Sequence, residues 1–181
     1  MSKRNPESSK SKGLIPNFVF RDVTDITPQF LSRQNIKFLM MDLDNTIAAY
    51  NEHVISDSIK DWVSETENSG VKLFVISNST RTSRVTSLSE SIGVKFIMKA
   101  CKPSGKSLQK AMEMTNFDTA NSALVGDQIF TDGIAAKRAG VTSLIVRPRR
   151  FTNPFLAIRY FFELPFRAFS IRQNINLEDY K

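Results

Sequence analysis

Short apolar runs alternate along the chain with longer segments in which apolar residues recur at helical spacing. Several of the helical segments are followed by a glycine, a residue that commonly ends a helix. The expected strands are 36–41, 71–76, 94–97, 122–125 and 142–146, and the expected helices are 56–69, with Ser56 as its cap, 81–92, 104–115 and 131–139. This order predicts an α/β fold, a three-layer sandwich in which helices cover both faces of a central, mainly parallel sheet.

Four polar residues follow the predicted strands. They are Asp42, Ser77, Lys102 and Asp127. In an open parallel sheet, ligands bind beyond the carboxyl ends of the strands. The four side chains are therefore expected to meet at one rim of the sheet and to form a site there.

Two carboxylates, Asp42 and Asp44, lie two positions apart at the end of a buried strand. Ionised carboxylates in such a place need a cation to compensate them. Mg²⁺ prefers a few carboxylate oxygens together with water and phosphate oxygens. The predicted magnesium ligands are Asp42, Asp127 and Asp44, the last through its backbone carbonyl.

This pattern is typical of phosphoryl transfer. Asp42 is the expected nucleophile, which attacks phosphorus to form an aspartyl-phosphate, and Asp44 is the expected acid and base. Ser77 and Lys102 are expected to donate to the phosphoryl oxygens. Asp132 is expected to orient either the water shell of the metal or Lys102.

Two of these assignments have alternatives. Lys99 and Lys106 lie close enough in sequence to Lys102 to take its place beside the phosphate. Ser77 and Asn78 are of the types that cap helices, and a helix is predicted to follow them.

The four segments resemble the four motifs of the haloacid dehalogenase superfamily, in order and over residues 15 to 147. Its phosphatases carry Asp-x-Asp-x-Thr, matched by Asp42, Asp44 and Thr46, and Gly-Asp-x-x-x-x-Asp, matched by Gly126, Asp127 and Asp132. The resemblance implies the Rossmann-like fold of that superfamily and adds Thr46 and Asn78 to the substrate-binding residues. Dehalogenases lack the second carboxylate, so dehalogenation is not expected.

The intervals between the motifs are short. About 35 residues separate Asp42 from Ser77, and the predicted helix and strand use nearly all of them. An inserted cap domain therefore has no room, and the site is expected to lie open, as in the capless branch. Such a site suits a phosphate presented on a large body.

Further runs are similar to the YqeG-type phosphatases, a branch related to the phosphatidylglycerophosphate phosphatases. They are Ile26-Thr27-Pro28, Met41 to Thr46, Lys102-Pro103 and Val125 to Asp132. The similarity fades before Gly13 and after Arg150. The expected organisation is a disordered basic arm at 1–12, a phosphatase domain at 13–150 and a Phe-rich tail at 151–181.

Charge is concentrated at the two ends of the chain. Of a net charge of +7, residues 1–12 carry four basic side chains and one acidic, and residues 147–172 carry six arginines and one glutamate. The body between them is close to neutral, so the ends are expected to meet an anionic partner, a lipid surface or a nucleic acid. With one cysteine and no apolar N-terminal segment, the protein is expected in the cytoplasm, peripheral at the inner face of the membrane.

Six of the fourteen phenylalanines fall between Phe151 and Phe169. Charged residues recur every fourth position there, at Arg159, Glu163 and Arg167, so a helix would carry one narrow polar stripe. The three charges and Pro165 disfavour a membrane span. The apolar remainder is expected either in a membrane interface or packed against the domain or a second copy.

These observations favour a magnesium-dependent phosphomonoesterase, with phosphatidylglycerophosphate at the membrane surface as the leading substrate. One alternative keeps the chemistry but acts on a soluble metabolite or a nucleic-acid end. Another is a binding or scaffold protein without turnover, which the intact motif positions disfavour.

Overall fold

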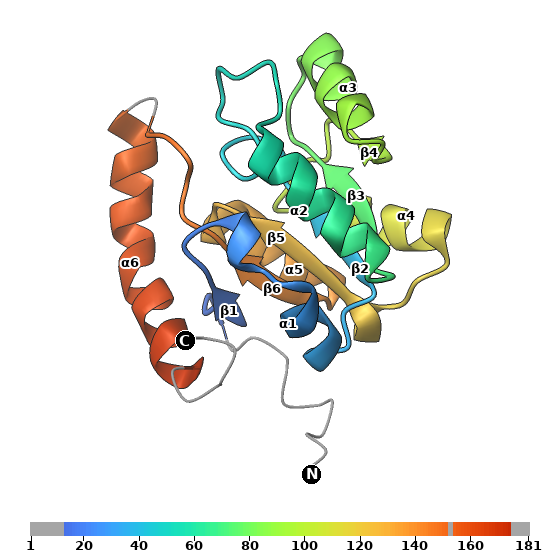
Figure 1. Cartoon of the computed structure of the whole chain (residues 1–181). Coiled ribbons are helices and arrows are strands. Elements are labelled where there is room, and N and C mark those ends of the chain that lie inside the picture. Colours follow the sequence, from blue (N-terminus) through green and yellow to red (C-terminus); the bar gives the residue numbers. More distant parts are fainter. Residues whose placement is uncertain (1–12, 152–153, 175–181) are drawn as a thin grey trace.

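The computed structural model describes residues 13–151 and 154–174 of the protein, and its centre is one parallel sheet (Figure 1). The strand order is β1-β6-β5-β2-β3-β4. The strands are β1 (Phe18–Val19), β2 (Phe38–Met41), β3 (Lys72–Ile76), β4 (Phe96–Ile97), β5 (Ser122–Gly126) and β6 (Thr142–Ile145). The arm predicted at 1–12 lies outside the described residues.

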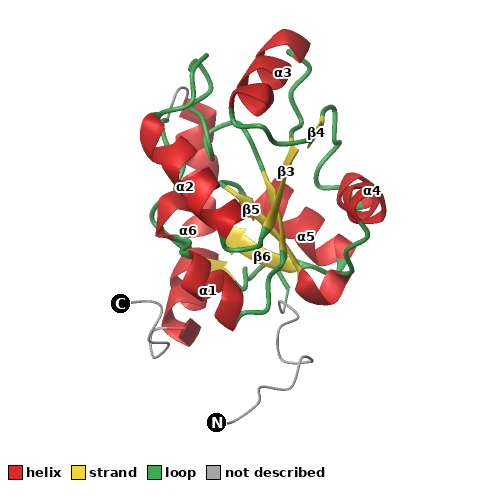
Figure 2. Cartoon of the chain, turned by 45° about the vertical axis from the view of Figure 1, so that its right-hand side comes forward, coloured by secondary structure: helices red, strands yellow, loops and turns green. Residues whose placement is uncertain are grey.

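Helices cover both faces of the sheet, which confirms the predicted three-layer α/β fold (Figure 2). On one face the core is completed by α1 (Pro28–Arg33), α2 (Asp57–Asn68) and α3 (Thr82–Ser91). On the other face it is completed by α4 (Lys106–Thr115) and α5 (Ile134–Ala139). Alternate residues of β2 contribute to the two cores, as the pleat of a strand requires.

The predicted strands and helices agree with the structure to within a few residues, with three differences. Ser56 is the N-cap of α2, but its hydroxyl makes no capping hydrogen bond. The helix predicted over 131–139 begins instead as a π-helical turn, Ile129–Gly133, and continues as α5. The third difference is β1, an edge strand of two residues that pairs with β6.

Residues 42–71, between β2 and β3, hold only α2 and the loop that leads to it. No domain is inserted in this interval, nor between β3 and α4, where α3 and β4 fill the chain. The carboxyl ends of β2, β3 and β5 therefore remain without a cap in the described part of the chain.

The predicted tail helix is α6 (Pro154–Asn174), which lies beside β1 at the edge of the sheet (Figure 1). It packs on the domain through its charged side. Glu163 and Arg167 are buried, whereas Phe155, Phe161 and Phe162 are 82%, 68% and 63% exposed. The expected polar stripe exists, but it faces the protein and leaves the apolar side uncovered.

Candidate active site

The motif residues meet at one rim because three central strands run in register. Met41 at the end of β2 lies opposite Val75 of β3 and Val125 of β5. The residues that follow these strands are thereby brought together, and the backbone N–H of Asp42 donates to the Val125 carbonyl at 2.8 Å. Parallel pairing has turned distant sequence segments into neighbours.

A lysine joins two carboxylates at this rim. The ammonium Nζ of Lys102 lies 2.5 Å from Oδ1 of Asp42 and 2.7 Å from Oδ1 of Asp132. All three residues are buried. The candidate lysines Lys99 and Lys106 are exposed, so the structure brings only Lys102 of the three into contact with these acids.

Asn78 fixes the backbone of Lys102 from both sides. Its amide NH₂ donates to the Lys102 carbonyl at 2.9 Å, and its Oδ1 accepts from the Lys102 N–H at 2.8 Å. The N-cap of α3 is Arg81, so neither Ser77 nor Asn78 caps that helix. Asn78 also lines the cavity above the rim.

The pKa values in this cluster depart from their ordinary range. Burial raises the pKa of Asp42 from 3.8 to about 7, against the lowering effect of Lys102 and with a further rise from the charge of Asp132. Burial acts to lower the pKa of Lys102, but the carboxylates of Asp132 and Asp42 overcome it and raise that pKa. Lys102 is therefore a permanent cation beside the nucleophile candidate.

The acids at the rim have the donor set that a divalent cation requires. One carboxylate oxygen each from Asp42, Asp127 and Asp132 lie within 4.8 Å of one another. Both oxygens of Asp127 are buried without a hydrogen-bond partner among the described residues, and burial raises the pKa of this group well above its usual value, helped by the charges of Asp132 and Asp42. Unpartnered buried carboxylate oxygens fit a hard cation such as Mg²⁺.

Gly126 makes room for this cluster. A Cβ at this position would lie 2.3 Å from Cγ of Asp132, closer than any real side chain allows. Oδ2 of Asp132 accepts from the N–H of Gln128 at 3.1 Å, which fixes the carboxylate in that space. Gly126 is thus required for steric reasons, because any side chain there would collide with Asp132.

Asp44 is held by an arginine that the sequence pattern did not single out. Its Oδ1 accepts from Arg84 at 2.6 Å, and the same guanidinium donates to the carbonyls of Ala49 and Glu52. Arg84 is 4% exposed on α3. The Asp44 carboxylate is therefore directed to Arg84 rather than to the cluster of Asp42, and its carbonyl remains the predicted metal ligand.

A second arginine stands at the opening of the site. Arg81 lies 4.0 Å from Oδ1 of Asp44, stacks over the ring of Tyr50 and donates to the Tyr50 carbonyl. Both residues line the cavity. Helical arginines are most often solvated, so only the fold identifies Arg81 and Arg84 as site residues.

Thr46 and Ser77 are buried beneath the rim. The Thr46 hydroxyl lies 3.5 Å from Oδ2 of Asp42, and the Ser77 hydroxyl accepts from the N–H of Ser79 at 3.1 Å. Ser77 is fully buried and its neighbours line the cavity. Its role as a phosphate ligand stays a prediction.

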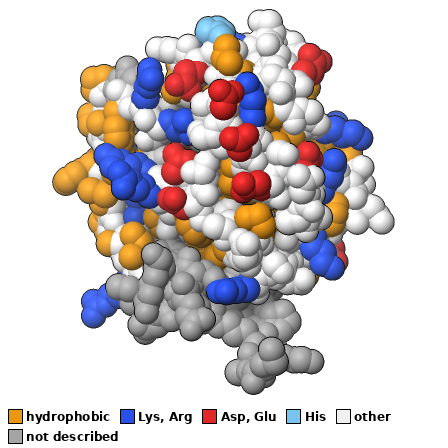
Figure 3. Space-filling model, in the orientation of Figure 1, with side chains coloured by type: hydrophobic (Ala, Val, Ile, Leu, Met, Phe, Trp, Pro, Cys, Tyr) orange, Lys and Arg blue, Asp and Glu red, His pale blue; other side chains and the backbone are white. Residues whose placement is uncertain are grey.

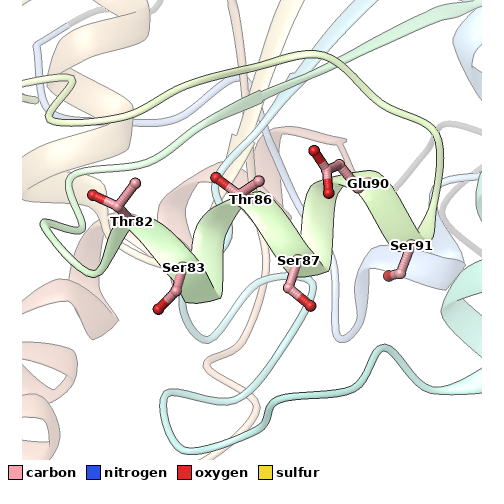
Figure 4. A pocket seen from close by; sticks show the side chains of 6 residues that line it. All are labelled: Thr82, Ser83, Thr86, Ser87, Glu90 and Ser91. Atoms are coloured by element: carbon pink, nitrogen blue, oxygen red, sulfur yellow. The ribbon is translucent and has the colours of Figure 1, made fainter.

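The cavity above these residues has a volume of about 410 Å³. Its walls come from the ends of β2, β3 and β5 and from the start of α6, where Leu156 contributes. Another hollow follows one side of α3 and is lined by hydroxyl groups and Glu90 alone (Figure 4). It lacks a cation and a second acid, so the chemistry belongs to the cavity at the rim.

The arrangement places the Asp42 carboxylate, the Lys102 ammonium and the other two acids of the cluster at the bottom of one cavity, with Asp44 at its side. Asp42 as nucleophile and Asp44 as acid and base stay predictions. These groups suit attack on phosphorus, because a phosphoryl group needs positive charge around its oxygens and little covalent chemistry.

Comparisons with known proteins agree with this geometry. A family model described as mitochondrial PGP phosphatase matches residues 8–149. A Bacillus subtilis (strain 168) protein described as "Probable phosphatase YqeG" is 30% identical over 145 residues, which cover 80% of this chain and 84% of that protein.

Solved structures share the fold at low sequence identity. A putative 3-deoxy-D-manno-octulosonate 8-phosphate phosphatase from Vibrio cholerae superposes with a TM-score of 0.54 and 15% identity, over 73% of this chain and 76% of the other. A putative HAD superfamily (subfamily III A) hydrolase from Legionella pneumophila gives 0.50 and 13%, over 79% and 93%. Taken with the site, the family match shows that the chain belongs to the PGP phosphatase family and is a capless phosphatase of the haloacid dehalogenase superfamily.

Proposed function

We propose that this phosphatase is magnesium-dependent, that it works through an aspartyl-phosphate on Asp42, and that its substrate is phosphatidylglycerophosphate at a membrane surface. The observation that carries the mechanism is the position of Asp42. Its carboxylate lies 2.5 Å from Lys102 and within 4.8 Å of carboxylate oxygens of Asp127 and Asp132. A nucleophile so placed meets a phosphate whose charge is already compensated.

In the first step an oxygen of Asp42 attacks phosphorus, and the bond from phosphorus to the ester oxygen breaks. Asp44 gives its proton to the departing alkoxide. In the second step water attacks the phosphorus of the aspartyl-phosphate and gives a proton to Asp44. The bond between phosphorus and Asp42 breaks, so phosphate is released and the Asp42 carboxylate is restored. Lys102 donates to a phosphoryl oxygen in both steps.

A metal ion bound here would supply charge neutralisation and a fixed orientation for the phosphate. Asp42 and Asp127 would hold it with the Asp44 carbonyl. Asp132 would keep Lys102 in place, because its Oδ1 lies 2.7 Å from that ammonium and forms an ion pair with it. Magnesium is proposed over softer metals because all these donors are oxygens.

Three observations support the lipid substrate. The matching family model carries the PGP phosphatase description. The rim is uncapped, so a headgroup can enter while the rest of the lipid stays outside. Arg81 lines the cavity beside Asp44, where a cation suits the second, diester phosphate of phosphatidylglycerophosphate.

The test is phosphate release from phosphatidylglycerophosphate in vesicles and from p-nitrophenyl phosphate, with Mg²⁺ or with EDTA. We expect Asp42→Asn to lose activity on both substrates by a factor of about 10³ or more, because it removes the nucleophile. EDTA should abolish the wild-type activity, and Mg²⁺ should restore it.

Undiminished turnover by Asp42→Asn would exclude the aspartyl-phosphate. Turnover of p-nitrophenyl phosphate without turnover of the lipid would leave the chemistry in place and exclude the substrate. Efficient turnover of glycerol 3-phosphate or of a phosphorylated nucleic-acid end would instead favour a soluble substrate. Asp61→Asn, an exposed carboxylate on α2 outside the cavity, is the matched control.

A further inference from the structure

One side of α6 is apolar and uncovered. This surface, the α6 apolar face, consists of Phe155, Ile158, Phe161, Phe162 and Phe169, all exposed. In Figure 3 hydrophobic side chains gather on the side of the molecule where Figure 1 shows α6. Several neighbouring exposed aromatic residues on one helix are uncommon for a surface that stays in water.

The orientation of α6 is fixed by hydrogen bonds on its other side. Glu163 accepts from the backbone N–H of Ile129 at 2.8 Å and from Arg167 at 2.9 Å. Arg167 also donates to the carbonyls of Asp127 and Val146 at 2.5 and 2.9 Å. Turning the helix to bury its phenylalanines would break the three bonds to Ile129, Asp127 and Val146 and would expose the ion pair, so the apolar side faces outward.

Exposed arginines lie along the border of the uncovered side. Arg21 and Arg147 are exposed beside a groove of about 360 Å³ between β1 and α6, whose apolar lining comes from Val19, Phe20, Leu164, Ala168 and Ile171. Exposed Arg172 lies in the last turn of α6. An apolar surface bordered by arginines suits an amphiphile with a negative headgroup.

The start of α6 brings the α6 apolar face next to the cavity, because Phe155 of that face is followed directly by Leu156. Leu156, in the first turns of α6, lines the cavity. Further along the helix Phe166 packs edge-on against Phe130, in the segment that follows Asp127. A surface that meets the Phe155 end of the α6 apolar face therefore lies next to the cavity.

We propose that the α6 apolar face docks on an anionic lipid bilayer and holds the cavity opening at the lipid headgroups. Within the described residues no helix has both the length and the apolar character needed to cross a bilayer, so α6 would lie in the interface. The arginines favour a lipid surface over a second copy of this chain, because a copy would bring the same positive charge to the contact. This inference rests on the proposed function for its lipid substrate.

The test uses the full chain and vesicles of neutral lipid alone or with phosphatidylglycerol, without substrate. We expect the wild type to sediment with the anionic vesicles and the double variant Phe161→Ser, Phe162→Ser to bind about tenfold more weakly. Turnover of p-nitrophenyl phosphate should stay unchanged, because neither residue lines the cavity. The matched control is Val54→Ser, Met114→Ser, which removes two exposed apolar side chains elsewhere.

Equal vesicle binding by wild type and the α6 double variant would overturn the proposal. A wild-type dimer that the double variant abolishes, without vesicle binding, would assign the face to a second copy and also overturn it. Vesicle binding is measured without turnover, so its failure is distinct from failure of the substrate assignment. If the protein binds the vesicles but does not hydrolyse phosphatidylglycerophosphate, the docking proposal stands and only the substrate assignment is wrong.

Discussion

Asp44 depends on Arg84 for its position beside the cavity. The guanidinium uses three nitrogens at once, on the Asp44 carboxylate and on the carbonyls of Ala49 and Glu52. It thereby joins the loop after β2 to α3 and holds Asp44, the proposed proton carrier, at a fixed place. Lysine cannot reproduce these contacts, because its single ammonium lacks the planar fork.

We expect Arg84→Lys to reduce the turnover of phosphatidylglycerophosphate, whose leaving group is an alkoxide, by about 10² or more, the usual scale of general acid catalysis. Turnover of p-nitrophenyl phosphate should fall far less, since its leaving group departs without a proton. The measurement is kcat for both substrates. Ser87→Ala, on the exposed side of the same helix, is the control.

Equal losses on the two substrates would contradict a role through Asp44 and indicate a general effect on the fold. A thermal denaturation midpoint close to that of the wild type would be needed to interpret either result.

The sequence allowed us to predict the residues that meet at the rim, but not the residues, such as Arg84, that fix their positions. Asp42, Lys102, Asp127 and Asp132 come together because each follows a strand or its loop, a position that the apolar pattern reveals. Arg84 could not be found in this way. Its three acceptors lie 32 to 40 positions away, and only the packing of α3 on the loop brings them together.

At the scale of elements, α6 is joined to the site by the hydrogen bonds that its buried ion pair, Glu163 and Arg167, makes to the domain. Arg167 is 3% exposed and neutralises buried Glu163 while holding the Asp127 carbonyl. Burial raises the pKa of Glu163, and Arg167 opposes that rise. Removing one partner of such a pair leaves an uncompensated buried charge.

We expect Arg167→Met to lower the free energy of unfolding by about 3–5 kcal/mol. Glu163→Gln should cost less, because an amide oxygen can still accept from Ile129. Arg167→Met should also raise the Mg²⁺ concentration needed for half-maximal activity, since the Asp127 loop loses a donor. Urea denaturation and magnesium titration measure the two effects.

The exposed Arg172 provides the control on the same helix, and Arg172→Met should leave both quantities unchanged. An Arg167→Met variant with wild-type stability and wild-type magnesium dependence would contradict the anchoring role.

The elements themselves were largely predictable, and their orientation was not. Five of the six strands follow from short apolar runs, but β1 has only two residues and gives no periodic signal. For α6 the spacing of Arg159, Glu163 and Arg167 predicted the helix and its stripe correctly. It did not predict that the stripe would face the protein. Backbone groups of the site donate to Glu163 and accept from Arg167, and these partners come together only in the folded chain.

For the whole molecule, the acid cluster makes stability depend on pH and on metal. The pKa of Asp42 is about 7 in the folded protein and 3.8 as an ordinary carboxyl, and that of Asp127 is raised as well. The folded, metal-free protein therefore retains protons that the unfolded chain releases. Its stability from these groups is full below about pH 4 and is lost as the pH rises through about 7.

We expect the denaturation midpoint of the metal-free protein to fall by several degrees between about pH 5 and pH 8. Mg²⁺ should raise the midpoint more at the higher pH, where its carboxylate ligands are ionised. Asp42→Asn cannot titrate at this position, so its midpoint should change less with pH. Thermal denaturation of both proteins, with EDTA or Mg²⁺, gives the comparison.

If the denaturation midpoints of the wild type and Asp42→Asn changed equally with pH, groups other than Asp42 would determine the pH dependence of stability.

The outward face of α6 has a consequence for kinetics. An enzyme held on a bilayer meets its substrate at a surface density, so its rate follows the mole fraction of that lipid and not the amount suspended in the solution. Diluting the substrate with inert lipid at constant total substrate would slow such an enzyme. Five aromatic and aliphatic side chains on one helix would thus convert a search in three dimensions into one in two.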